Sequence, residues 1–300
     1  MPRILALCGG VGGAKLADGL QQVLSPGELT IIVNTGDDFV HRGLPVWPDI
    51  DTVLYTLGGI ANPEQGWGRA DESWQVQREW QRLGEDTWFQ LGDRDIALHL
   101  LRREWLDAGM APTQVCAALA QRFGIPARVL PMAEVPAPTI VIGEDGPLPF
   151  QEYFVRRRCQ PVLRGLTLGA AAHASMSAPV REALEDPRLE GIILCPSNPY
   201  LSVAPILAVP GLRQHLAATA VPVIAVSPII GGEALKGPAA KIMRELGVTP
   251  SPRSVAQEYR DFLDLLLVDP PDLPAADPDS VAFEPAPIVM RSREDRQRLA

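Results

Sequence analysis

A glycine-rich segment lies near the start of the chain, between an apolar run at residues 4–7 and a helix-like stretch at residues 16–24. Residues 8–15 have the sequence CGGVGGAK. A strand, a glycine turn and a helix start, in this order, direct free backbone N–H groups and the helix dipole at one point, where they bind anions. The segment predicts a phosphate or nucleotide site, with a purely structural turn as the alternative. Its candidate ligands are Gly10, Gly12, Gly13 and Lys15.

Two common phosphate-binding motifs do not fit this segment. A Walker A loop requires Gly-Lys-Ser/Thr, but Lys15 is preceded by Ala14 and followed by Leu16, so no hydroxyl is placed to hold magnesium. The dinucleotide fingerprint fails at its third glycine, because Lys15 stands where that glycine is required. The segment is therefore neither motif in its usual form.

Composition narrows the class of protein. The 300 residues are 46% hydrophobic and 21% charged, which is enough for one large α/β domain. A net charge of −9 argues against a nucleic-acid partner, which normally needs a basic face. The four cysteines form no CxxC pair, and no apolar run has the length of a membrane span. We expect a cytoplasmic protein that binds neither nucleic acid nor membrane.

The order of apolar segments predicts the fold. Runs near residues 3–7, 30–34, 191–195 and 222–226 are rich in Ile, Val and Leu without alternation, as in strands buried on both faces. Helical patterns lie between them, so the chain is predicted to be a single α/β domain, 1–300, with a doubly wound, mostly parallel sheet. A helical insert at about 45–125, with all six tryptophans, is expected over the carboxyl edge of this sheet, and a small β-rich element at about 128–165. Residues 269–287 are expected to be a surface excursion before a terminal strand and helix at 288–299.

Acidic residues follow the second predicted strand. Asp37 and Asp38 come at its end, where the loops of an open α/β sheet face the ligand. They could accept a ribose hydroxyl or bind Mg²⁺, or they could form an Asx-type turn. A second pair, Asp49 and Asp51, precedes a helical pattern. These two could simply cap a helix, or they could assist metal-dependent phosphoryl transfer.

Three further segments carry polar groups at predicted strand ends or helix starts. Arg94, between two aspartates, could bind a phosphate or a flat heterocycle, or could form a local ion pair. Ser197 and Asn198 lie between two prolines in a stiff turn that could hold a nucleotide or be plain turn chemistry. Lys236 follows a glycine pair before a helix and could belong to a second anion site or to an ordinary cap.

Together these motifs resemble the 2-phospho-L-lactate transferase family, and the match runs nearly end to end. The ordered set is GGVGGAK at 9–15, NTGDD at 34–38, DTxLY at 51–55, GWG at 66–68, LGDRD at 91–95, CPSNP at 195–199 and KGP at 236–238. The resemblance implies a Rossmann-like, Mg²⁺-dependent transferase of coenzyme F(420) biosynthesis that forms a homodimer. It implies transfer of a phosphorylated three-carbon acid from a guanosine diphosphate-linked donor to the deazaflavin Fo, with release of GMP. The acid could be 2-phospho-L-lactate, or the phosphoenolpyruvate or 3-phosphoglycerate equivalent.

The resemblance also implies roles for individual residues. Asp51 and Arg94 match residues that contact Fo, and Asp37 and Asp51 are the candidate catalytic carboxylates. Asp37, Asp38 and Asp51 are the candidate Mg²⁺ ligands. The glycine segment, Ser197, Asn198 and residues 227–236, with Lys236, would hold the guanosine diphosphate part of the donor.

Two other classes stay open from the sequence. One is a nucleotide-sugar-binding regulatory protein of the same superfamily, which would share the glycine segment. The other is a nicotinamide dehydrogenase, which the incomplete fingerprint disfavours.

Overall fold

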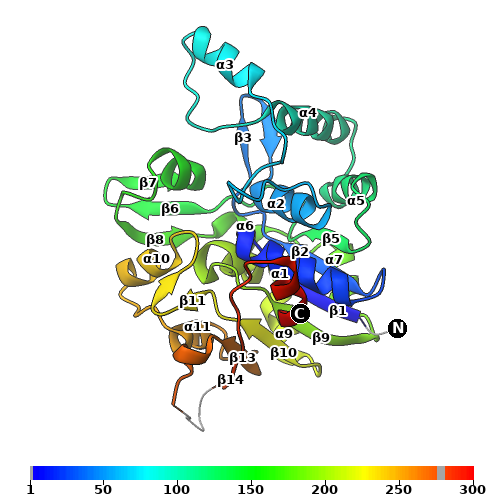
Figure 1. Ribbon diagram of the computed structural model, residues 1–300, viewed down its shortest axis with the longest axis vertical. Coiled ribbons are helices and arrows are strands. Elements are labelled where there is room, and N and C mark those ends of the chain that lie inside the picture. The colour runs from blue at the N-terminus through cyan, green and yellow to red at the C-terminus, as the bar shows by residue number, and fades with distance from the viewer. Residues whose placement is uncertain (1–2, 276–280) are drawn as a thin grey trace.

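A seven-stranded parallel sheet forms the centre of the molecule (Figure 1). The computed structural model describes residues 3–275 and 281–300. The strand order is β14-β13-β10-β9-β1-β2-β5, and every neighbouring pair is parallel. Their bounds are β1 (Arg3–Cys8), β2 (Leu29–Val33), β5 (Arg128–Pro131), β9 (Leu189–Leu194), β10 (Val223–Val226), β13 (Leu265–Val268) and β14 (Ala282–Pro285). The predicted doubly wound, Rossmann-like α/β class is confirmed.

The order of the strands reverses beside β1. From β1 the chain first moves to β2 and β5 on one side, then returns to β9 on the other side and continues outward to β14. Loops that leave β1 and β9 therefore diverge at the carboxyl edge, and the opening between them is where ligands bind in sheets of this kind. The topology places any site next to Gly9 and Pro196.

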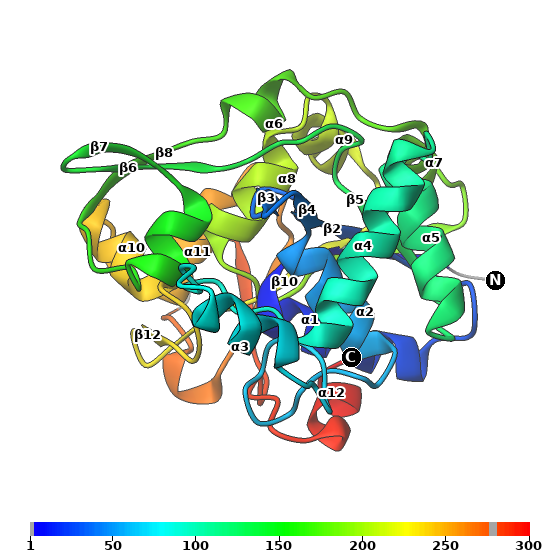
Figure 2. The ribbon, with the colours of Figure 1, turned by 90° about the horizontal axis from the view of Figure 1, so that it is seen from above.

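Two helical layers cover the sheet because successive strand residues face opposite sides (Figure 2). On β1, Leu5 and Leu7 belong to one core cluster, whereas Ala6 and Cys8 belong to the other. The first cluster is completed by α6 (Gly169–His173), α7 (Ala178–Leu184), α8 (Ala204–Ala208), α9 (Leu212–Ala218), α10 (Ala239–Glu245) and α11 (Pro252–Glu258). The second is completed by α1 (Gly10–Val23), α2 (Pro48–Leu57), α4 (Asp93–Asp107) and α5 (Pro112–Arg122), with α12 (Arg293–Leu299) at its margin.

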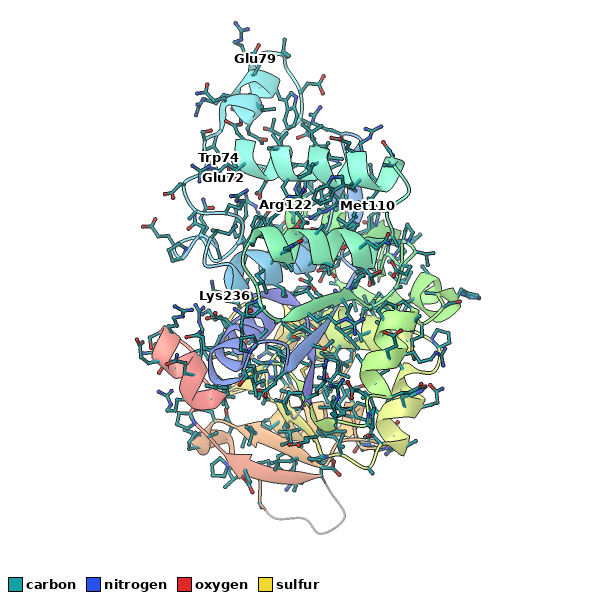
Figure 3. The ribbon with its side chains drawn as sticks, turned by 90° about the vertical axis from the view of Figure 1, so that its right-hand side faces the viewer. Glu72, Trp74, Glu79, Met110, Arg122 and Lys236 are labelled. Carbon is teal, nitrogen blue, oxygen red and sulfur yellow. The ribbon has the colours of Figure 1, made fainter. Side chains whose placement is uncertain are left out.

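Two smaller units lie above the carboxyl edge of the sheet. One contains the hairpin β3 (Phe39–His41) and β4 (Leu44–Val46), followed by α2, α3 (Gln75–Arg82), α4 and α5. Figure 3 shows these helices one above another, with Glu79 of α3 farthest from the sheet. The other is an antiparallel sheet, β7-β6-β8, made of β6 (Ile140–Gly143), β7 (Gly146–Pro149) and β8 (Leu163–Thr167). A π-helix, η1 (Glu152–Arg156), connects β7 to β8.

Short elements complete the described chain. They are the π-helix η2 (Pro199–Val203), the two-stranded ladder β11 (Ile229–Ile230) and β12 (Glu233–Ala234), and the 3-10 helix η3 (Pro270–Asp272). Within residues 3–275 and 281–300, no helix is long and apolar enough to cross a membrane.

Several boundaries differ from the sequence predictions. Helix α1 begins at Gly10, so the glycines form its first turn rather than a loop before it. The expected surface excursion at 269–287 contains β14, an edge strand of the main sheet, and residues 288–292 form no strand. Residues 276–280 of that excursion lie outside the described part of the chain. Helix α12 agrees with the predicted terminal helix.

Helix α12, at the C-terminal end of the chain, packs against α1. The buried carboxylate of Asp18 accepts a hydrogen bond from Arg296 Nη1 at 2.8 Å. At Gly19 the two helices approach so closely that a Cβ would lie 2.1 Å from the carbonyl oxygen of Arg296. Residues 288–291, directly before α12, line the cavity described below.

We expect Gly19→Ala to destabilise the protein by about 1–3 kcal/mol, because α12 must shift to admit the methyl group. Gly169→Ala is the matched control, since a Cβ there makes only an ordinary 3.6 Å contact with Thr167. Urea unfolding of both variants measures the difference. If Gly19→Ala is as stable as the control, the close packing of α1 on α12 is wrong.

Candidate active site at the switch point of the sheet

The loops after β1 and β9 are joined by hydrogen bonds. The backbone N–H of Gly9 donates to Ser197 Oγ at 3.0 Å, and the same hydroxyl donates to the carbonyl oxygen of Gly9 at 2.8 Å. The next residue, Asn198, caps η2 by accepting from the N–H groups of Tyr200 and Leu201. The predicted polar turn is therefore used to fix the two loops against each other.

This contact also explains the glycines of α1. A Cβ on Gly12 would lie 2.5 Å from the carbonyl oxygen of Pro196, and one on Gly13 would lie 2.6 Å from Ser197 Oγ. Gly10 has φ of +65°, a left-handed conformation that side chains disfavour. The glycines thus allow the two loops to pack together as well as opening the start of the helix.

The first turn of α1 presents free donors to a cavity. The N–H of Gly10 donates to Asp49 Oδ1 at 2.8 Å. Among the described residues, none accepts a hydrogen bond from the N–H of Val11 or Gly12, and both residues line the cavity. A helix start with unpaired donors attracts anions, so the predicted phosphate site is geometrically available here.

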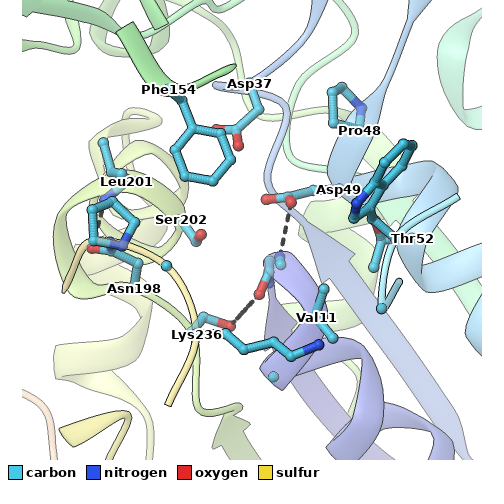
Figure 4. A pocket seen from close by; sticks show the side chains of 18 of the residues that line it. Val11, Asp37, Pro48, Asp49, Thr52, Phe154, Asn198, Leu201, Ser202 and Lys236 are labelled. Carbon is cyan, nitrogen blue, oxygen red and sulfur yellow. Dashed lines mark hydrogen bonds between the residues drawn. The ribbon is translucent and has the colours of Figure 1, made fainter. Parts of the chain in front are cut away.

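Two lysines flank this helix start. Lys15 Nζ donates to the carbonyl oxygen of Met290 at 2.9 Å, and burial, with the nearby charges of Arg296 and Lys236, lowers its pKa. Lys236 has no hydrogen-bond or ion-pair partner in the described part of the chain, and its side chain extends toward the start of α1 (Figure 4). Its ammonium lies against Gly66, where a Cβ would be only 2.1 Å from Nζ. Both lysines can therefore meet an anion at this helix.

The cavity measures about 1010 Å³ and collects most of the predicted site residues. It is lined by the start of α1, by α2, and by loops from both smaller units and the C-terminal segment. The predicted residues Gly10, Gly12, Lys15, Asp37, Asp51, Ser197, Asn198 and Lys236 line it. Gly13, Asp38 and Arg94 are not among its lining residues.

Asp37 and Asp49 form a linked pair of carboxylates on one side of this cavity (Figure 4). Both accept hydrogen bonds from Asn34 Nδ2, at 3.0 Å and 2.8 Å respectively. Burial raises the pKa of Asp37 well above its usual range, and the neighbouring Asp49 raises it further. Burial also raises the pKa of Asp49 to about 6, against the opposing effect of its hydrogen bonds from Asn34 and Gly10. From the sequence, Asp49 was a candidate helix cap or an acidic residue for metal-dependent phosphoryl transfer, but it was not among the predicted site residues.

Asp51 has a different environment. Both of its carboxylate oxygens are bonded to the guanidinium of Arg102, which is fully buried and lies 4.3 Å over the ring of Trp47. His99 Nδ1 is 3.9 Å from the same carboxylate, and burial lowers the pKa of His99 to about 4. Asp51 thus reaches the cavity as half of a neutralised pair.

The two predicted residues nearest to these acids lie off the cavity. Asp38 is directed into the protein, where its Oδ1 has no hydrogen-bond partner among the described residues and burial raises its pKa. Arg94 is exposed on the first turn of α4, where its N–H donates to Glu72 Oε2 at 2.9 Å. Its predicted contact with Fo stays a prediction.

The neighbouring Asp95 does reach the cavity. It is buried, and its Oδ1 accepts a hydrogen bond from Tyr55 OH at 2.7 Å. Burial, together with the charges of Asp51 and Glu72, raises its pKa to about 7. Aromatic side chains from helices and loops line the same cavity: Tyr55, Trp67, Trp88, Phe89, Phe150 and Phe154. Such surfaces suit a flat heterocycle.

Few side chains in the cavity could act as metal ligands. No group of three or more His, Cys, Asp or Glu side chains within the described residues is arranged to hold a metal ion. Mg²⁺, however, is commonly bound through one or two carboxylates, with substrate phosphates and water completing its shell. Asp37 and Asp49 fit this pattern, because Asn34 joins them and Asp49 also accepts a hydrogen bond from Gly10 at the helix start that suits a phosphate.

Comparison with known proteins agrees with the sequence motifs. The family model described as "2-phospho-L-lactate transferase CofD" matches residues 4–297. The chain is 41% identical to the phosphoenolpyruvate transferase of Kitasatospora aureofaciens, over 99% of this chain and 95% of that protein. It is 36% identical to the 2-phospho-L-lactate transferase of Methanosarcina mazei, over 99% of this chain and 98% of that protein.

A solved structure shares the fold at lower similarity. A UPF0052 family protein from Bacillus halodurans superposes with a TM-score of 0.58 at 17% identity, covering 92% of this chain and 82% of that one. This likeness supports the architecture alone. With the family model and the relatives spanning almost the whole chain, the protein belongs to the 2-phospho-L-lactate transferase (CofD) family of transferases.

Proposed function

We propose that this protein transfers a phosphorylated three-carbon acid from a guanosine diphosphate-linked donor to a hydroxyl of the deazaflavin Fo and releases GMP. The observation that carries the proposal is the meeting, in one cavity, of free helix-start donors and a pair of carboxylates. Transfer of a phosphoryl group from a diphosphate to a hydroxyl needs alignment and charge neutralisation more than covalent catalysis. The cavity offers both.

The donor is assigned to the switch point. The N–H groups of Val11 and Gly12, with Lys15 and Lys236, supply positive partners for a diphosphate. The loop carrying Ser197 and Asn198 lines the same end and would lie beside the nucleoside. The phosphate site that the glycine segment predicted thus becomes a diphosphate site shared by two loops.

Asp37 and Asp49 are the residues we propose to hold Mg²⁺. Asp51 and Asp38 are the weaker candidates, because the first is paired with Arg102 and the second is not among the residues that line the cavity. A bound Mg²⁺ would neutralise the charge of the diphosphate and assist departure of GMP. Asp37 would also be placed to accept the proton of the attacking hydroxyl.

The acceptor Fo is assigned to the aromatic side of the cavity. Its flat ring system suits the aromatic side chains there, and its hydroxyls suit Asp51 and Asp95. In the transfer, the hydroxyl oxygen bonds to the phosphorus that carries the three-carbon acid, the bond from that phosphorus to the GMP oxygen breaks, and the hydroxyl proton is lost. Asp51, held by Arg102, would orient the acceptor.

The identity of the acid is best tested first with the guanylylated donor that carries phosphoenolpyruvate. The relative at 41% identity is named a phosphoenolpyruvate transferase, whereas the one named for 2-phospho-L-lactate is 36% identical. The decisive experiment incubates the purified protein with Fo, Mg²⁺ and each guanylylated donor in turn. We expect equal amounts of GMP and of Fo extended by the phospho-acid, measured by chromatography and mass spectrometry. Consumption of donor without any change in Fo would refute the transfer.

We expect Asp37→Asn and Asp49→Asn each to lower turnover by about a hundredfold or more, the scale of removing one preorganised catalytic group. Both variants should also need more Mg²⁺ for half-maximal rate, because a ligand charge is lost. GMP release across a magnesium titration measures both effects. Asp38→Asn is the matched comparison, and we expect its magnesium requirement to stay near that of the parent.

The opposite pattern of magnesium requirements would assign the metal to different ligands. If Asp38→Asn raised the magnesium requirement while Asp49→Asn left it unchanged, the ligand set predicted from the sequence would replace the pair seen in the cavity. Thermal midpoints of all three variants show whether a loss of rate reflects a loss of folding.

Lys15→Ala should weaken binding of GDP by about tenfold, since one cation beside the helix start is removed, and should leave Fo binding nearly unchanged. Calorimetry with GDP and fluorescence titration with Fo give the two affinities. Equal loss in both titrations would instead indicate that the bond from Lys15 to Met290 serves mainly to hold the C-terminal segment in place.

A further inference from the structure

Three consecutive arginines lie at the end of η1 and directly after it, and they differ in their partners. Arg156 is paired with Asp86 at 2.7 Å and with Glu152 at 3.3 Å, and Arg157 Nε is 3.1 Å from Glu152. Arg158 lines the cavity, and within the described chain its guanidinium has no hydrogen-bond or ion-pair partner. Two of the arginines are therefore occupied outside the cavity, and the third is available to a ligand.

The backbone at Arg158 is strained. Its φ is +50°, in the left-handed region where glycine is favoured and most side chains are uncommon. A strained position of this kind is sustained only where the surrounding structure holds it, and it often accompanies a binding role. A π-helix such as η1, which ends two residues before Arg158, is likewise frequent at functional sites.

The segment that carries Arg158 is tied to the carboxylate pair. Gln151 Nε2 donates to the carbonyl oxygen of Asp37 at 3.1 Å. Phe150 and Phe154 stack with their ring centroids 5.3 Å apart, and both line the cavity. Figure 4 shows Phe154 beside Asp37, whereas Val11 and Lys236 lie on the other side of Asp49. The segment therefore forms a wall next to the proposed reacting phosphate.

We infer that Arg158 binds the carboxylate of the three-carbon acid on the donor, an inference that rests on the function proposed above. The donor carries three anionic groups. In the proposed function, its two phosphates are bound by the helix start of α1, Lys15, Lys236 and the metal. Its carboxylate has been given no binding partner so far. A guanidinium presents two parallel N–H donors that match a carboxylate. The guanidinium of Arg158 belongs to the wall of the cavity next to the phosphate that carries the acid.

The test compares Arg158→Gln with Arg157→Gln, which removes an equal charge one residue away but outside the cavity. We expect Arg158→Gln to raise the donor KM by about tenfold or more while the dissociation constant of GDP, which lacks the acid, stays within about twofold. Arg158→Lys should recover part of the lost affinity. Arg157→Gln should leave both constants near those of the parent.

Arg158→Gly separates binding from folding. Glycine relieves the strain at this position, so the thermal midpoint should be unchanged or higher while the donor KM rises as in Arg158→Gln. An unchanged KM in both variants would overturn the assignment, and so would a parallel loss of GDP affinity, which would place Arg158 on the diphosphate. Absence of GMP release by the parent protein would instead overturn the proposed function, and the assignment with it.

Discussion

The hydrogen-bonded contact between Gly9 and Ser197 is the feature on which the rest of the site depends. It joins the loops after β1 and β9, the two strands between which the order of the sheet reverses. Because the glycines of α1 admit the backbone of Pro196 to close contact, the helix start can open beside the second loop. The cavity is thus a consequence of topology, and its donors are backbone groups whose positions the sheet fixes.

Charge is distributed around this cavity in two different ways. Asp37 and Asp49 share one asparagine and repel each other, so the pair is most stable when a cation or a proton neutralises it. Asp51 is already neutralised by Arg102, a fully buried side chain from α4. Breaking such a buried pair leaves an uncompensated charge, which is commonly costly by about 3–5 kcal/mol. The two arrangements suit two roles, one as a metal-binding pair and one as a fixed hydrogen-bonding group.

Much of this architecture could be predicted from the sequence, because the signals are local. Unbroken apolar runs predicted four strands of the main sheet, and the glycine segment predicted the helix start at which we propose the phosphate site. The start of α1 at Gly10 was not predicted, because glycine is a poor helix former. Glycine is needed in this turn only because Pro196 and Ser197 lie so close to it, and the sequence does not show that contact. The edge strand β14 was hidden in a segment rich in proline and aspartate, where its pairing with β13 decides its conformation.

The assignment of individual carboxylates could not be predicted, because their partners are distant in sequence. Arg102, which pairs with Asp51, lies 51 residues further along the chain, and Asn34, which joins Asp37 to Asp49, is 15 residues before Asp49. A sequence pattern shows Asp49 and Asp51 as equivalent helix caps, whereas the fold directs one to the helix start of α1 and the other to a buried arginine. Likewise Arg94 and Asp95 are neighbours in sequence, yet only Asp95 lines the cavity.

We propose that the diphosphate and the metal meet between the start of α1 and the Asp37–Asp49 pair. A crystal structure of the protein with GDP and Mn²⁺, in which anomalous scattering locates the metal, tests it most directly. We expect Mn²⁺ bound by Asp37 and Asp49 and a GDP phosphate within hydrogen-bonding distance of the N–H groups of Val11 and Gly12. Mn²⁺ bound at Asp38 or Asp51 instead, or GDP bound away from α1, would contradict it.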